Sequence, residues 1–95
     1  MPRRNDRKQS SRRRIFFKLR APSAQKVQLA GSFNSWDPAT RVLRRDAKGT
    51  WKTSMLLEPG AYEFRFLVDG EWHNDPEAEQ IPNSFGSTNN LLTVM

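Results

Sequence analysis

The stretch "AYEFRFLVDGEW", residues 61–72, combines the two strongest β signals in the chain. Its first eight residues alternate between an apolar and a mixed side, as expected of a strand with one buried face. The apolar side carries Tyr62, Phe64, Phe66 and Val68. Asp69-Gly70 follows, a dipeptide that favours a two-residue hairpin loop between antiparallel strands. The stretch therefore predicts a β-hairpin and indicates an all-β domain.

A two-residue loop also fixes the register of this hairpin. Leu67 then pairs with Trp72, and Phe66 pairs with His73. Because directly opposed residues share a face, Trp72 lies with Leu67 and beside Arg65, away from the apolar strip. A slip of one residue would turn the indole into the core, so a core tryptophan remains the alternative.

The rest of the sequence reads as further short strands with turn residues between them, and no convincing helix occurs. The expected strands are residues 14–20, 26–31, 41–45, 50–57, 61–68 and 89–94, with one long loop over residues 74–87. This pattern predicts a small antiparallel β-sandwich. The predicted core consists of Phe17, Val27, Leu29, Trp51, Met55, Leu57, Tyr62, Phe64, Phe66, Val68 and Leu92.

Charge is concentrated at the N-terminus. Residues 1–14 hold seven Lys/Arg and one Asp, whereas residues 15–95 hold nine basic and nine acidic side chains. A segment almost without apolar groups cannot offset its ordering entropy by burial, so residues 1–14 are predicted to be a disordered basic tail and residues 15–95 the folded domain. The tail either aids solubility or makes weak electrostatic contacts with nucleic acid, anionic lipid or an acidic partner.

The composition also bears on location. The chain has no cysteine, which excludes a disulfide framework and a thiolate site and suits a reducing compartment. No apolar run is long enough for a membrane span or a signal peptide, so no membrane insertion is expected. These features favour a cytoplasmic protein.

The aromatic side chains indicate a binding surface. Trp36 lies in a polar loop, and Trp72 is predicted to face outward; exposed apolar patches of this kind usually bind a ligand. A sugar offers C–H faces that stack on aromatic rings and hydroxyls that need amide or guanidinium partners, for which Asn89 and Asn90 are candidates. Single-stranded nucleic acid is the alternative, but it is disfavoured by the acidic residues 69–79.

At these residues the sequence resembles a known family. The segments "VQLAGSFNSWDP", "YEFRFLVDGEWHNDP" and "FGSTNN", in this order, are similar to the glycogen-binding module of AMP-activated protein kinase β subunits and to the early set modules of starch-branching and debranching enzymes. The likeness covers residues 14–94. It implies an immunoglobulin-like β-sandwich of the early set type that binds α-1,4-glucans such as glycogen, starch and maltodextrins.

The resemblance also implies roles for single residues. Trp36 and Trp72 match the two tryptophans of the sugar platform. Arg65 stands where the kinase modules carry a lysine, and Phe85 stands where they carry a leucine that reaches through cyclic glucans. Further predicted contacts are Ser87 and Asn89 at the sugar hydroxyls and, from the hairpin register, Leu67 beneath the platform.

The sequence shows no catalytic constellation. It lacks a Gly-x-Ser-x-Gly elbow, a phosphate-binding loop and a His/Cys metal cluster, and its one histidine, His73, is expected to face inward. The carboxylates of residues 69–79 lie on a turn and a solvated loop rather than in the cleft of a glycosidase. We therefore expect a non-catalytic carbohydrate-binding module without a cofactor. The alternative is an immunoglobulin-like interaction module that docks a kinase or a glucan-modifying enzyme and whose sugar site is weak or vestigial.

Overall fold

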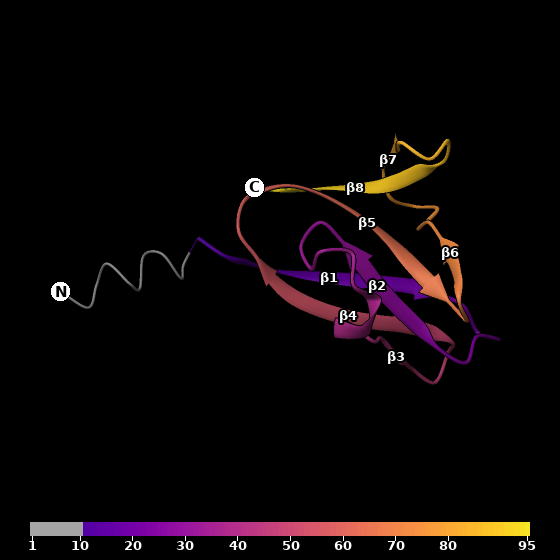
Figure 1. Cartoon of the computed structure of the whole chain (residues 1–95). Coiled ribbons are helices and arrows are strands. Elements are labelled where there is room, and N and C mark those ends of the chain that lie inside the picture. The colour runs from indigo at the N-terminus through magenta and orange to yellow at the C-terminus, as the bar shows by residue number, and fades with distance from the viewer. Residues whose placement is uncertain (1–10) are drawn as a thin grey trace.

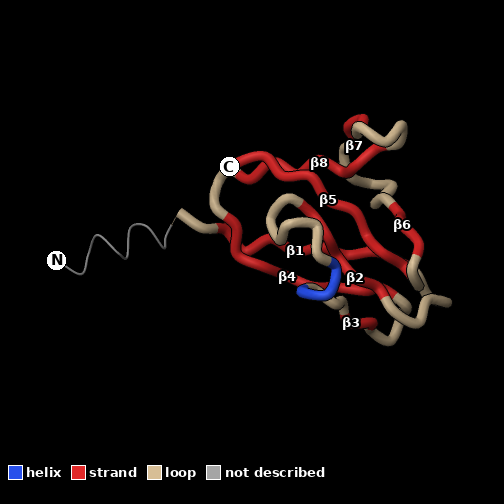
Figure 2. Tube along the Cα trace, in the orientation of Figure 1, coloured by secondary structure: helices blue, strands red, loops and turns tan. Residues whose placement is uncertain are grey.

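Two antiparallel sheets packed face to face make up the protein, which a computed structural model describes for residues 11–95 (Figures 1 and 2). The smaller sheet has the order β1 (Arg13–Arg20), β4 (Thr50–Leu57), β3 (Arg44–Arg45). The larger sheet has the order β2 (Val27–Gly31), β5 (Gly60–Val68), β8 (Thr88–Val94), β7 (Gln80–Pro82), and β6 (Glu71–His73) pairs with β5. A 3-10 turn, η1 (Pro38–Thr40), follows β2. The predicted all-β, immunoglobulin-like sandwich is confirmed.

Two of the strand predictions differ from the structure. The strand expected over residues 41–45 is shorter, because only Arg44–Arg45 pair with β4 and Val42 makes an isolated bridge to Gln28. The long loop expected over residues 74–87 contains β7, which pairs with β8. Pro82 in β7 weakens the sequence signal for a strand, and its missing N–H is tolerated because β7 is the edge of the sheet.

The core lies between the two sheets and is rich in phenylalanine. The rings of Phe17 and Phe64 approach to 5.2 Å, and those of Phe64 and Phe66 to 5.8 Å, both nearly edge to face. The buried apolar cluster consists of Phe17, Val27, Leu29, Leu43, Trp51, Leu57, Phe64, Phe66 and Val94. The other predicted core residues, Met55, Tyr62, Val68 and Leu92, are partly buried at its margin, and Leu43 and Val94 are core residues that the strand pattern missed.

The hairpin register is confirmed. Leu67 lies opposite Trp72 and Phe66 opposite His73. Asp69 and Gly70 both have positive φ, 49° and 85°, as a type I′ turn requires. Trp72 is 44% exposed, so it lies on the outer face of the sheet and the core alternative is wrong.

The prediction that His73 faces inward is wrong. His73 is exposed, and its Nε2 lies 3.8 Å from Oε1 of Glu71. The residue does share the side of the sheet on which Phe66 lies. However, all three residues of β6 are exposed, so the smaller sheet does not cover this edge strand of the larger sheet.

The predicted tail lies mostly outside the described residues, which begin at Ser11. Arg13, which was assigned to the tail, and Arg14, which was assigned both to the tail and to the strand over residues 14–20, form the start of β1. Over residues 11–95, no helix is long and apolar enough to span a membrane.

Candidate functional site

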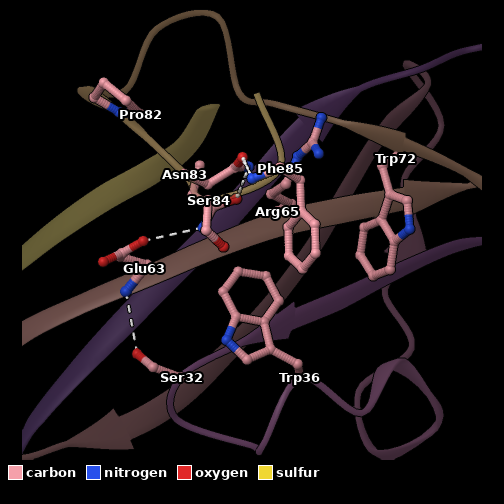
Figure 3. A pocket seen from close by; sticks show the side chains of 10 residues that line it. Ser32, Trp36, Glu63, Arg65, Trp72, Pro82, Asn83, Ser84 and Phe85 are labelled. Carbon is pink, nitrogen blue, oxygen red and sulfur yellow. Dashed lines mark hydrogen bonds between the residues drawn. The ribbon is translucent and has the colours of Figure 1, made fainter. Parts of the chain in front are cut away.

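A cavity of about 750 Å³ opens on the outer side of the larger sheet, where β5 meets the loop after β2 and the loop after β7 (Figure 3). This volume lies in the usual range of small-ligand sites. The cavity is lined by Ser32, Trp36, Glu63, Arg65, Trp72, Pro82, Asn83, Ser84, Phe85 and Asn89. Five of the seven predicted site residues are thus brought together: Trp36, Arg65, Trp72, Phe85 and Asn89.

The loop that carries Trp36 is bent sharply. Ser35 and Trp36 both adopt left-handed backbone conformations, with φ of 57° and 59°. This conformation is unfavourable for a bulky side chain, and residues held in it tend to occur at functional sites. Here the amide of Trp36 donates to the carbonyl of Gly31 at 2.9 Å, and the Asn34 side chain accepts from the Gly31 amide at 2.9 Å and donates to the Asp37 carbonyl at 3.2 Å. These bonds hold the indole at the cavity, where it is 37% exposed.

Arg65 is positioned by a partner that the sequence did not reveal. Its Nε donates to Oδ1 of Asn74 at 2.7 Å. Asn74 in turn donates through Nδ2 to Oγ1 of Thr88 at 2.7 Å and to Oε1 of Gln80 at 3.3 Å. This network occupies Nε only. The two terminal nitrogens of Arg65 make no hydrogen bond to any described residue and remain available at the cavity.

Asn89 has a different setting from the one expected. It is only 9% exposed, its Nδ2 donates to Oε1 of Glu63 at 3.0 Å, and its Oδ1 accepts from Nδ2 of Asn83 at 3.0 Å. Its amide therefore ties together two polar residues of the cavity wall. Glu63 could have been found from the sequence, because it lies two residues before Arg65 and so shares its face of the strand.

Phe85 projects from the loop after β7 and is 92% exposed. Oδ1 of Asn83 accepts from the amides of Phe85 at 2.9 Å and Ser87 at 3.1 Å, and the backbone amide of Asn83 donates to the carbonyl of Ser87 at 3.0 Å. Ser87 thus closes the turn that presents Phe85, and it does not line the cavity itself. Asn83 could not be found from the sequence, because residues 74–87 were expected to form one long loop.

Two further sequence predictions are placed differently. Leu67 is half-buried opposite Trp72 in the hairpin and is not part of the cavity lining. Asn90, one of the two candidate amides, is fully buried. Its side chain accepts from the Asp75 amide at 2.7 Å and donates to the Asp75 carbonyl at 3.0 Å. Asn90 therefore holds the loop before β7 and lies outside the cavity.

The cavity combines three exposed rings with groups of both charges. Figure 3 shows the rings of Trp36, Phe85 and Trp72 grouped around it, with Arg65 among them. Glu63 is the one carboxylate among the lining residues. The part of the chain that the structure describes contains no group of three or more His, Cys, Asp or Glu side chains arranged to hold a metal ion. The arrangement suits a neutral ligand with apolar faces and polar edges.

Comparison with known proteins identifies the family of the chain. Residues 15–95 match the family described as the glycogen recognition site of AMP-activated protein kinase. The chain belongs to this family. Its resemblance to glycogen- and starch-binding modules is thereby confirmed.

Individual relatives come from plants and animals. The chain is 45% identical over 71 residues to protein FLOURY ENDOSPERM 6, chloroplastic, of Oryza sativa subsp. japonica, and 42% identical over 72 residues to protein PTST homolog 2, chloroplastic, of Arabidopsis thaliana. These matches cover 75% and 76% of the chain but 13% of each relative. The chain is also 33% identical over 72 residues to the 5'-AMP-activated protein kinase subunit beta-1 of Sus scrofa, and this match covers 74% of the chain and 55% of the relative.

These relatives contradict the predicted cytoplasmic location, because the two plant proteins are named as chloroplastic. The prediction depended on the missing cysteines and the missing apolar run. Neither feature distinguishes one reducing compartment from another.

Proposed function

We propose that the chain is a non-catalytic module that binds α-1,4-glucans by stacking glucose units on Trp36 and Trp72. The observation that carries the proposal is that these two indoles, from segments far apart in the sequence, are both exposed and line one cavity. The C–H groups on the faces of a glucose ring pack well on the electron-rich face of an indole. Two such platforms suit successive units of a curved glucan chain.

Polar groups beside the indoles supply the partners for sugar hydroxyls. The terminal nitrogens of Arg65 act as donors, and the carboxylate of Glu63 accepts. A carboxylate or guanidinium makes stronger hydrogen bonds to a hydroxyl than a neutral group does. The Asn89 amide, which already bonds Glu63 and Asn83, keeps one N–H for a hydroxyl and holds the acceptor in place.

The remaining predicted contacts act at the margin of the site. Phe85 covers the apolar side of the sugar from its exposed position on the loop. Ser87 fixes the turn that carries Phe85, and Leu67 supports Trp72 from the neighbouring strand. These two residues therefore contribute to affinity through the rings that they position.

We also infer that the site is not catalytic. Glycoside hydrolysis usually requires two carboxylates on either side of the scissile bond. Glu63 is the only carboxylate among the residues that line this cavity, and it accepts a hydrogen bond from Asn89. Incubation with maltoheptaose should therefore leave the oligosaccharide intact, as judged by chromatography of the products.

Because two relatives are named as chloroplastic proteins, we propose a starch-type glucan as the natural ligand. Calorimetric titration with maltoheptaose and with β-cyclodextrin tests the proposal. Saturable binding of both is expected, and cellohexaose, a β-1,4-glucan with a different shape, should bind more weakly. The absence of saturable binding to either α-glucan would refute the proposal.

A second candidate is an interaction module that docks a kinase or a glucan-modifying enzyme, with a weak sugar site. One relative is itself named as a kinase subunit, and the basic residues 1–14 provide charge for an acidic partner. Partner capture that is unaffected by Trp36→Ala and Trp72→Ala but lost on removal of residues 1–14 would favour this candidate.

A further inference from the structure

The outer side of the smaller sheet is basic. In β1, the buried Phe17 alternates with exposed residues, and the pairing with β4 and β3 fixes which of their side chains share that outer side. We call this surface the basic face; it consists of Arg14, Phe16, Lys18, Arg20, Arg44, Lys52 and Leu56. The sequences of β1, β3 and β4 contain no Asp or Glu. Residues 15–95 carry no net charge, but their basic side chains are concentrated on the smaller sheet.

Three of these cations stand in one row across the sheet. Lys18 lies directly opposite Lys52, and Lys52 lies directly opposite Arg44. Adjacent strands are about 4.8 Å apart, and like charges in directly opposed positions destabilise a sheet. Only Lys52 has a compensating partner, Asp46, at 3.2 Å. Lys18 and Arg44 form no ion pair with any residue between 11 and 95. Like charges in this row disfavour the isolated domain, and an anionic partner would relieve the repulsion.

Apolar side chains stand among the cations. Phe16 is 75% exposed and Leu56 is 49% exposed, although both lie within the paired strands β1 and β4. A surface that mixes an exposed ring, an aliphatic side chain and arginines has the composition of a protein interface. A single-stranded nucleic acid would use several rings for base stacking, and this face presents one.

We propose that the basic face docks an acidic segment of a partner protein, whose carboxylates meet the Lys18–Lys52–Arg44 row and whose apolar side chains contact Phe16 and Leu56. The arginines are suited to this role because a guanidinium pairs with a carboxylate in a two-pronged geometry. The face belongs to the other sheet from the proposed sugar cavity, so a partner and a glucan bind at the same time. The proposal holds whether or not the cavity binds sugar.

The dimensions of the face predict a modest affinity. Two inter-strand spacings give a width of roughly 10 Å, and eight strand residues give a length of roughly 25 Å. Along β1, Lys18 and Arg20 line a hollow of about 260 Å³ together with Asp75 and Glu77, which bounds the face on this side. An area this small is typical of transient interfaces. The contact should also be sensitive to salt, because its ion pairs are exposed to solvent.

The test uses the full chain and a fluorescent random copolymer of glutamate and tyrosine as the probe, measured by anisotropy at low and physiological salt. Lys18→Glu and Arg44→Glu, each made separately, should weaken binding roughly fivefold. Phe16→Ser should also weaken it. The matched control is Lys26→Glu, an equal charge change at an exposed lysine outside the basic face. The cations of residues 1–13, which are not part of the basic face, are the same in every variant, so differences between variants report the substituted residue.

Thermal melting separates this role from a structural one. Because Arg44→Glu turns a repulsive pair with Lys52 into an attractive pair, this variant should keep or raise the melting temperature while it loses affinity. Lys18→Glu gains the same attraction to Lys52 but meets Asp75 and Glu77 across the hollow, so Arg44→Glu is the decisive variant for stability. Equal weakening by Lys26→Glu would show binding to net charge alone and would overturn the proposal. Tighter binding of an oligothymidylate or of phosphatidylglycerol vesicles than of the copolymer would overturn it as well, by identifying another class of partner.

Discussion

Nε of Arg65 lies 2.7 Å from Oδ1 of Asn74, so the guanidinium group is oriented by the protein before a ligand binds. Asn74 is in turn anchored on β8 through Thr88, at 2.7 Å. A side chain that is held in its binding conformation loses less entropy on binding than a free one. The affinity of the cavity should therefore depend on Asn74, which need not touch the ligand.

Asn74→Ala removes the acceptor that orients Arg65. We expect glucan binding to weaken roughly threefold to tenfold, because about one hydrogen bond of orientation is lost. Asn74→Asp is the matched control: it keeps an acceptor for Arg65 but loses the bond that Asn74 donates to Thr88. It should lose stability while it retains most of the affinity. Calorimetric titration with β-cyclodextrin measures both variants, and wild-type affinity in Asn74→Ala would show that Arg65 needs no such support.

Gly31 is the residue at which the Trp36 loop leaves β2, and it has no room for a side chain. A Cβ at this position would lie 2.5 Å from the carbonyl oxygen of Glu63 and 2.7 Å from the ring of Phe33. Gly31→Ala should therefore lower the free energy of unfolding by about 1–3 kcal/mol, as other overpacked substitutions do. Urea denaturation measures this change. A variant as stable as the wild type would mean that the loop adjusts freely.

Asp46 caps the turn between β3 and β4. Backbone N–H groups of Thr50 and Lys48 bond its carboxylate, and together with the ammonium group of Lys52 they lower the pKa of Asp46 from 3.8 to about 2. A depressed pKa in the folded state means that this carboxylate stabilises the fold above about pH 4. The contribution is lost as the pH falls towards 2.

Thermal melting of the wild type and of Asp46→Ala checks this dependence. The wild type should melt at a higher temperature than the variant at pH 7, and the two melting temperatures should converge as the pH approaches 2. An equal difference in melting temperature at pH 7 and near pH 2 would show that the negative charge of Asp46 does not contribute to the stability of the fold.

The central hairpin could be predicted from the sequence because its signals are local. Asp69-Gly70 determines the turn, the turn determines the register, and the register places Trp72 outward opposite Leu67. His73 could not be placed in the same way. Its side of the strand follows from the register, but its exposure depends on whether the second sheet extends that far, which is a property of the whole fold.

The cavity was predictable in part. Trp36 and Arg65 were found as single residues, and the structure adds the bonds that position them. Those bonds join residues far apart in the sequence, such as Arg65 with Asn74 and Glu63 with Asn89. Asn90 shows the opposite error, since its residue type suits a sugar hydroxyl but its burial beneath the Asp75 loop excludes that use. Local pattern does not determine which of two neighbouring asparagines faces the ligand.

The central claim is that Trp36 and Trp72 together bind an α-glucan, and it is tested most directly by titrating the wild type, Trp36→Ala and Trp72→Ala with maltoheptaose in a calorimeter. Both indoles are exposed, at 37% and 44%, so their removal should leave the melting temperature nearly unchanged. We predict saturable binding by the wild type and at least a roughly tenfold loss in each variant, because each platform stacks one glucose unit. Wild-type affinity in both variants would contradict the account.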